Sequence, residues 1–218
     1  MKKYLFAGIL SVLFLVSAMA QSEQDRAAES KGTALMKQAG EKLRSYRSMK
    51  VQFTYELGQA EQVVESMKGE LVSQDDKYHM EVDGNLFISD GINTWSYLEE
   101  MDEVYVNLLE HNEGGLTPTS ILNNFESQFR AKHIRQETYQ GKRVEIIDLV
   151  PKTPQAFYKF RVALDASTNM LVYTTAYDRE GGSYTYRIDR FEANPTVAGG
   201  IFSFNTSAFP DVEVIDLR

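Results

Sequence analysis

Three histidines are the first residues in this chain that could carry catalytic or metal chemistry. His79, His111 and His133 stand apart in the sequence, and none has a partner at a metal-ligand spacing. His79 alternates with Tyr78 and Met80, so in a strand it would point to the opposite side, toward solvent. We therefore expect no metal site and no catalytic histidine.

Carboxylates offer two further candidates for chemistry. The turn from Glu99 to Glu103 gathers oxygen atoms that could bind calcium, but it lacks the glycine and the ligand spacing of an EF-hand. We interpret it as a solvated hairpin tip. Glu56 and Glu65 could be the acid/base pair of a glycosidase, which needs surroundings that separate the two pKa values.

Motifs of the common enzyme classes are absent from the sequence. It contains no Gly-x-Ser-x-Gly, no phosphate loop and no dinucleotide-binding fingerprint. Cysteine is absent as well, which excludes disulfides and thiol catalysis. We expect a protein that is not an enzyme and that needs no cofactor.

The N-terminus has the pattern of a secretory signal. Met1-Lys2-Lys3 is a basic start, an apolar run follows to Val16, and Ala18-Met19-Ala20 is a small-x-small cleavage site. We expect cleavage after Ala20, with residues 21–218 forming a single exported domain. Formal net charge is −8, and it becomes −10 without the two signal lysines, which argues against a nucleic-acid partner.

The elements that must position any site begin with a helix. Residues 24–47 are rich in Ala, Glu, Lys and Gln, and Leu35, Ala39, Leu43 and Tyr46 recur at helical spacing. Gly40 weakens the middle of this amphipathic helix, so the helix could break at that position.

Strands follow the helix at short intervals. Residues 51–57 alternate strictly, and residues 62–73 form a second strand in which Gly69 predicts a bulge or bend. Residues 77–82 form a third. Residues 86–109 read as a three-stranded meander in which Trp95 and Tyr97 share one face, and we place this meander at the centre of the fold.

A short helix interrupts the strands before they resume. Thr117 is its expected cap and Pro118 its first residue. Five more strands are expected at residues 129–138, 143–150, 157–165, 170–178 and 183–191. About eleven strands with hairpin-sized connections indicate one antiparallel up-and-down sheet, which curls and leaves a concave trough beneath the helices.

Several short motifs occur in order along the chain. They are V-Q-F-T-Y at 51–55, G-E-L at 69–71, Y-H-M at 78–80, I-S-D-G-x-x-x-W-x-Y at 88–97, T-P-T-S-I-L at 117–122 and V-I-D-L-R near the end. Together they resemble the LolA family, the periplasmic carriers of outer-membrane lipoproteins. The resemblance implies an unclosed antiparallel β-barrel, or half-barrel, with an α-helical lid over a hydrophobic cavity that takes acyl chains.

The resemblance also implies partners and a location. An inner-membrane ABC transporter would release the lipoprotein to this carrier in the periplasm, and an outer-membrane receptor could accept it. A monomer is expected. The family carries a basic residue before a proline at the end of the second strand, where an arginine holds the lid shut; this chain has Gln74-Asp75-Asp76 there.

Two groups of residues are candidates for lipid binding. Carried over from the family by position, the cavity residues are Leu43, Phe53, Leu57, Tyr78, Leu122 and Phe160. Residues expected to share a face or element with them are Tyr55, Leu71, Met80, Trp95, Tyr97, Ile121, Phe125 and Val162. Two alternatives remain open, an envelope module that senses lipid or protein through a similar half-barrel and an envelope hydrolase.

Overall fold

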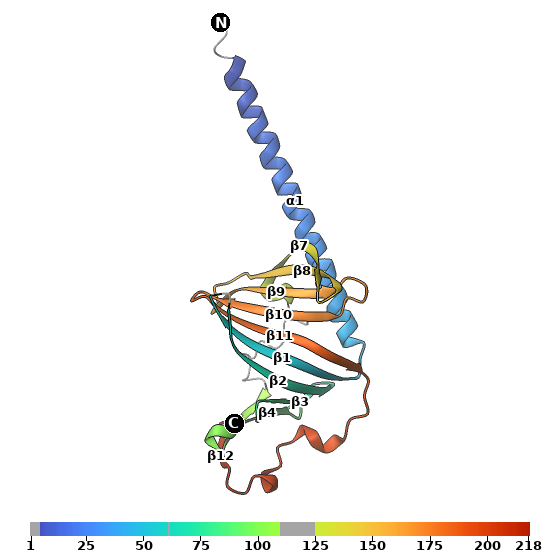
Figure 1. The fold of residues 1–218 in the computed structure, drawn as a ribbon, viewed down its shortest axis with the longest axis vertical. Coiled ribbons are helices and arrows are strands. Elements are labelled where there is room, and N and C mark those ends of the chain that lie inside the picture. Colours follow the sequence, from blue (N-terminus) through green and yellow to red (C-terminus); the bar gives the residue numbers. More distant parts are fainter. Residues whose placement is uncertain (1–4, 61, 110–124) are drawn as a thin grey trace.

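One large β-sheet with a long helix against one end forms the fold (Figure 1). The computed structural model describes residues 5–60, 62–109 and 125–218, with side chains from residue 21 onward. The elements are α1 (Leu5–Arg44), β1 (Ser48–Gln59), β2 (Gln62–Gln74), β3 (Lys77–Val82), β4 (Asn85–Ser89), β5 (Asn93–Leu98), η1 (Glu99–Met101), β6 (Glu103–Leu108), β7 (Phe129–Tyr139), β8 (Lys142–Pro151), β9 (Phe157–Asp165), β10 (Leu171–Asp178), β11 (Gly182–Ala193), η3 (Gly199–Phe202), η4 (Thr206–Ala208) and β12 (Glu213–Asp216).

The sheet is unclosed, as predicted, but its strand order is not that of a simple meander. Its order is β12-β6-β5-β4-β3-β2-β1-β11-β10-β9-β8-β7. Two antiparallel meanders, β1–β6 and β7–β11, are joined because β1 pairs with β11. The long strands β1, β2 and β11 therefore occupy the middle, and the expectation that residues 86–109 form the centre is wrong.

A twelfth strand makes the sheet mixed rather than purely antiparallel. β12 pairs with β6 in parallel, with Val214 opposite Val104. Only four residues long, β12 carries no alternating pattern that separates it from a loop, so the sequence predicted eleven strands. The other pairs are antiparallel, as expected.

Helix α1 covers the β7–β9 end of the sheet (Figure 1). Its buried residues Met36 and Ala39 pack into a core with Ile147, Phe160 and other sheet residues, and Leu35 and Leu43 pack against the same core. The amphipathic pattern is confirmed for Leu35, Ala39 and Leu43, whereas Tyr46 lies beyond the end of the helix at Arg44. The helix runs without a break through Gly40. Within the described helices, no stretch is long and apolar enough to cross a membrane.

Close contact and ion pairs fix α1 against the edge strand β7. A Cβ atom at Gly32 would lie 2.7 Å from the backbone nitrogen of His133, so only glycine permits this approach. Lys132 Nζ donates to Asp25 Oδ1 at 2.7 Å. The helix therefore lies directly on the backbone of β7.

Gly69 has a packing role rather than the predicted bulge. It pairs regularly with Phe53 and Val82, and a Cβ atom there would lie 2.4 Å from the Phe53 ring. The register shift between β1 and β2 falls instead at Leu57/Gly58. Gly69 therefore makes room for an aromatic ring that packs over the strand.

Residues 199–209, which include η3 and η4 and which we call the C-terminal segment, cover the face of the sheet opposite α1. Tyr97 lies 4.7 Å from Phe209 and 5.7 Å from Phe204 between ring centroids. Phe202 is buried, and η3 contacts β3. This segment therefore supplies the apolar cover that the meander β3–β6 needs on that side.

Most of the predicted lid lies outside the described residues. Residues 125–128 form one helical turn, and Phe125 is buried beside Phe129 in the core under α1. The expected cap Thr117, together with Ile121 and Leu122, falls in the part of the chain that the structure does not describe.

We expect Val162→Asp to destabilise the fold severely. Val162 is 1% exposed between Phe160 and Leu164 in the core beneath α1, so a carboxylate there loses its hydration without a partner. The free energy of unfolding should fall by at least ~3 kcal/mol in urea titrations. Val150→Asp, at a 38% exposed position on β8, is the control and should change it by less than about 0.5 kcal/mol. Equal losses would contradict this description of the core.

Candidate binding trough

Strand register decides which side chains share a face. In an antiparallel pair, residues directly opposite one another project to the same side of the sheet. One row of such partners crosses five strands and contains Leu149, Phe160, Ala176, Tyr184 and Leu57. Because Phe160 and Leu149 pack against α1, this row identifies the helix side of the sheet.

A second row extends the same face toward β4. It contains Val51, Leu71, Met80 and Phe87, which are partners across β1, β2, β3 and β4. Four strands therefore continue the apolar surface beyond the end that α1 covers.

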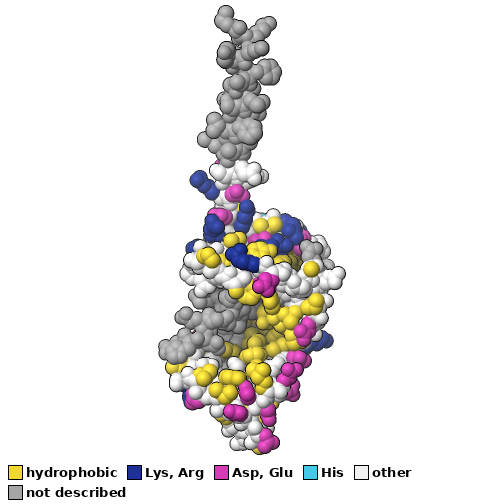
Figure 2. All heavy atoms as spheres, turned by 90° about the vertical axis from the view of Figure 1, so that its left-hand side faces the viewer, with side chains coloured by type: hydrophobic (Ala, Val, Ile, Leu, Met, Phe, Trp, Pro, Cys, Tyr) yellow, Lys and Arg dark blue, Asp and Glu magenta, His cyan; other side chains and the backbone are white. Residues whose placement is uncertain are grey.

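The middle of this face is apolar and incompletely covered by the described residues. We call it the trough and define it by its half-buried residues Tyr55, Leu57, Leu71, Tyr78, Met80, Phe87, Tyr184 and Tyr186. Figure 2 shows a hollow in the body of the molecule with hydrophobic side chains gathered along its wall. Such a surface is typical of a site that takes an apolar ligand.

Aromatic rings from β1 and β11 build the floor of the trough. The ring of Tyr186 lies 4.7 Å from that of Tyr55 and 5.7 Å from that of Phe53. Burial, reinforced by the neighbouring Tyr186, Tyr184 and Glu65, raises the pKa of Tyr55 to about 12. These phenols stay neutral at physiological pH, so the floor is uncharged but retains hydroxyl groups.

One buried hydroxyl on the same face has no hydrogen-bond partner among the described residues. Thr174 is 4% exposed, and it is the register partner of Tyr186 on one side and Val162 on the other. Its Oγ1 is therefore a free donor and acceptor on the helix side of the sheet.

The structure sorts the predicted lipid-binding residues into four groups. Tyr55, Leu57, Leu71, Tyr78 and Met80 line the trough, and Phe53 is 4% exposed in its floor. Leu43, Phe125, Phe160 and Val162 lie on the same side but belong to the core packed under α1. Ile121 and Leu122 lie outside the described residues.

Trp95 and Tyr97 form the fourth group, and the prediction that they face the trough is wrong. Trp95 is the register partner of Ile88 and Val106, and Ile88 pairs with His79. This row lies on the opposite side from Met80 and Phe87. Trp95 and Tyr97 do share one face, as their alternation predicts, but only the pairing across β3, β4 and β5 shows that this face lies opposite the trough.

Sequence reasoning missed the tyrosines of β11. Tyr184, Tyr186 and Ile188 alternate, and this pattern predicts one shared face. That this face lies beside Phe53 and Tyr55 follows from the β1–β11 pairing, which joins distant segments.

A polar cluster at the α1 end of the sheet was also missed. His133 Nε2 lies 2.6 Å from Glu145 Oε2, and Lys31 Nζ donates to the same oxygen at 3.2 Å. Burial acts to raise the pKa of Glu145, but hydrogen bonds from His133, Lys31 and Gln136 outweigh it and lower that pKa. The cluster ties α1 to β7 and β8.

The other candidates for chemistry do not come together. Glu56 forms a 2.8 Å ion pair with Arg187, whereas Glu65 is the partner of Leu57 and projects to the trough side. Carboxylates on opposite faces of a sheet cannot flank one glycosidic bond. Among the described residues no group of His, Asp and Glu could hold a metal ion, and His111 lies outside them.

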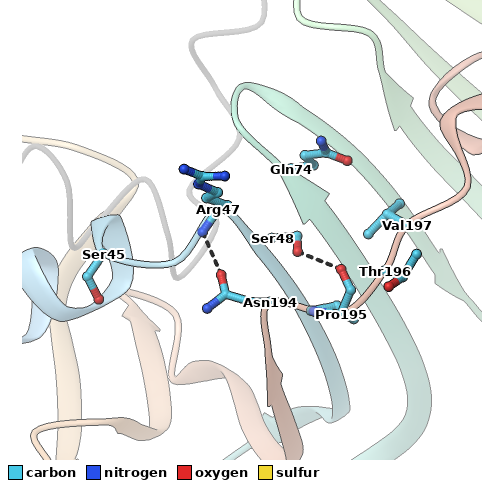
Figure 3. A pocket seen from close by; sticks show the side chains of 8 residues that line it. All are labelled: Ser45, Arg47, Ser48, Gln74, Asn194, Pro195, Thr196 and Val197. Atoms are coloured by element: carbon cyan, nitrogen blue, oxygen red, sulfur yellow. Dashed lines mark hydrogen bonds between the residues drawn. The ribbon is translucent and has the colours of Figure 1, made fainter.

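A polar pocket of about 430 Å³ lies at the junction of α1, β1, β2 and the segment after β11 (Figure 3). Within it, the backbone N–H of Arg47 donates to Asn194 Oδ1 and Ser48 Oγ donates to the Pro195 carbonyl, both at 2.8 Å. Ser48 is the partner of Gln74, so both belong to the face opposite the trough. The polar lining does not suit an acyl chain.

An indole placed in the trough should report ligand binding, whereas the native Trp95 should not. We expect Tyr186→Trp in a Trp95→Phe background to change its emission on titration with a fatty acid, because position 186 lies in the trough floor. The unmodified protein, whose Trp95 lies on the opposite face, is the control and should show no change. A response from Trp95 alone would contradict the assigned faces.

Glu145 should make stability depend on acid pH. A carboxyl whose pKa is lower in the folded state contributes stability above its unfolded pKa, near 4.5, and loses it as pH falls through the folded value. Below about pH 4.5 the melting temperature should therefore fall more steeply for the unmodified protein than for Glu145→Gln. Glu192→Gln, at an exposed position on β11, is the control and should keep the original profile. Identical profiles for all three proteins would rule out this role.

Comparisons with known proteins agree with this architecture. The family model described as outer membrane lipoprotein carrier protein LolA matches residues 44–205, and no curated protein matches the chain. An uncharacterized conserved protein from Thermus thermophilus is similar in structure, with a TM-score of 0.60 and 8% identity over 85% of this chain and 99% of that one. It shares the fold.

Two further solved structures are more distant. A putative outer membrane lipoprotein-sorting protein domain from Vibrio parahaemolyticus has a TM-score of 0.45 and 16% identity, covering 83% of this chain and 99% of that one. A chain of the Pseudomonas aeruginosa MucA/MucB complex has a TM-score of 0.45 and 12% identity, and the match covers 81% of this chain and 62% of that one. Since the family model spans most of the sequence, the chain belongs to the LolA family of outer membrane lipoprotein carrier proteins.

Proposed function

We propose that this protein carries lipoproteins through the periplasm by holding their acyl chains in the trough. After export and cleavage behind Ala20, the carrier would receive its cargo from an inner-membrane ABC transporter. It would then deliver the cargo to the outer membrane, to a receptor if one is present. The carrier would act as a monomer without a cofactor.

The observation that carries this proposal is the unequal cover that the described residues give to the two faces of one sheet. The C-terminal segment covers the meander on one face, where Phe204 and Phe209 pack on Tyr97. On the other face, the trough residues remain half-buried although they are apolar and contiguous. A surface of this kind is expected to be completed by a ligand.

The expected binding free energy suits a protein that binds acyl chains and then releases them. Each buried methylene contributes ~0.8 kcal/mol, so cover for about ten methylenes stabilises the complex by on the order of 8 kcal/mol. Complete burial of several chains would approach the limit of about −20 kcal/mol for noncovalent binding and would prevent release. A shallow, open trough therefore favours transfer.

Polar groups within the apolar wall suit the carbonyls of an acylated residue. The phenols of Tyr55 and Tyr186 line the trough and are neutral donors at physiological pH. An ester or amide carbonyl could accept a hydrogen bond there, which a plain hydrocarbon cannot do.

The direct test is to purify the exported protein from its native periplasm and identify by mass spectrometry what co-elutes. A carrier brings intact lipoproteins. A sensor would bring a signalling protein instead, and a hydrolase would bring neither, so either result would replace this proposal.

We expect Leu57→Asp to weaken acyl binding strongly while the protein stays folded. Leu57 is half-buried in the trough, so a carboxylate there is hydrated in the free protein. A bound acyl chain would remove this water and offer the charge no partner. Fatty-acid affinity should fall at least about tenfold in titrations followed by the indole introduced at position 186. Leu217→Asp, at a 55% exposed position near the C-terminus, is the matched control and should bind normally. Normal binding by both variants would show that the trough is not the acyl site.

A further inference from the structure

Half of strand β2 has no strand partner on its outer side among the described residues. β2 pairs with β1 along its whole length, but with β3 only from Gly69 to Gln74. The reason is the length of β3, which turns back at Asp83-Gly84 after six residues. Residues 62–68 therefore present an open strand edge of roughly 23 Å, at about 3.3 Å per residue.

This open edge is exposed and poorly protected. Val63 and Val64 are 62% and 66% exposed, and every residue from 62 to 66 is exposed. Natural edges are usually blocked by proline, by several charges or by a covering element. Residues 62–68 contain no proline and only two charged residues, Glu65 and Lys68. A single bulge at Val64 is the remaining protection.

The open edge borders the trough directly. Glu65 is the partner of Leu57, and Met67 is the partner of Tyr55, so the trough wall and the edge belong to the same pair of strands. The charge of Glu65 contributes to the raised pKa of Tyr55, which places this carboxylate near the trough floor. A peptide that extends from the trough across β2 would therefore pass directly beside residues 62–68.

We propose that residues 62–68 bind, by strand addition, the extended peptide that follows the acylated residue of the cargo. This inference rests on the proposed function, because the acyl chains in the trough bring the attached peptide to the edge. A strand edge recognises backbone N–H and C=O groups, so it accepts linkers of many sequences. Glu65 beside the edge disfavours acidic linkers and favours small, polar or basic ones.

Hydrogen exchange measured on the full mature protein tests the inference. The probes are a fatty acid and an N-acylated peptide of about seven small polar residues, with the indole at position 186 reporting trough occupancy. We expect both probes to change the indole emission, and only the acylated peptide to slow amide exchange in residues 62–68 by at least about tenfold.

The outcomes separate this inference from the proposed function. If neither probe changes the indole emission, the trough does not bind acyl chains and the proposed function fails. If both change it and exchange in residues 62–68 is unaltered by the peptide, the strand-addition inference alone is overturned. Slowed exchange that depends on protein concentration without peptide would also overturn it, because the edge would then pair with a second copy of the chain.

Two neighbouring proline substitutions provide the matched variants. Adjacent residues in a strand direct their N–H groups to opposite edges, so of Glu65→Pro and Ser66→Pro one removes an outward donor and the other removes a bond to β1. The outward variant should keep its melting temperature and should lose at least about tenfold more affinity for the acylated peptide than for the fatty acid. The inward variant should melt at a lower temperature. Full peptide affinity in the variant that keeps its melting temperature would overturn the inference.

Discussion

The pairing of β1 with β11 is the interaction on which the remaining structure depends. It joins two meanders that are otherwise separate, and it runs from Met49–Ala193 to Gln59–Gly182. Without it, the tyrosines of β11 would not lie beside the aromatic residues of β1, and the trough would have no floor. The same pairing leaves β12 and β7 at the outer ends of the sheet, so the barrel stays open.

The two faces of this open sheet are used in different ways. A sheet of this size must bury apolar surface on both sides, or expose it for a purpose. On one face the C-terminal segment returns beneath β3–β6 and closes the surface with its phenylalanines. On the other, α1 fills only the β7–β9 end, held by Gly32 and the Lys31–His133–Glu145 cluster. Among the described residues, the apolar surface between these two covered regions remains open, and this is where we propose that acyl chains bind.

Strand length adds a second asymmetry. β1 and β2 are twice as long as β3, so their hairpin extends past the meander that follows it. β6 is covered by β12 and β7 by α1, whereas the first half of β2 has neither kind of cover among the described residues. An apolar trough and an open strand edge thus occur side by side, and an acylated peptide has the same two chemical parts.

Local sequence patterns are sufficient to predict α1 and eleven of the twelve strands. Alternation and turn residues placed β1 to β11 within a few residues, helical spacing identified the face of α1 that packs, and the motifs indicated the family. Local patterns carry this information because side-chain period and turn geometry are local properties. Tertiary structure alone decided which faces meet. Trp95 and Tyr97 share one face, as their alternation predicts, but this face lies opposite the trough. Which face of the sheet a side chain occupies depends on the register of all the strand pairs between it and the trough. The β11 tyrosines of the trough were missed for the same reason, because only the β1–β11 pairing places them beside Phe53 and Tyr55. β12 was missed because its four residues carry no alternating pattern. The His133–Glu145 contact was missed because it depends on the register of the β7–β8 hairpin.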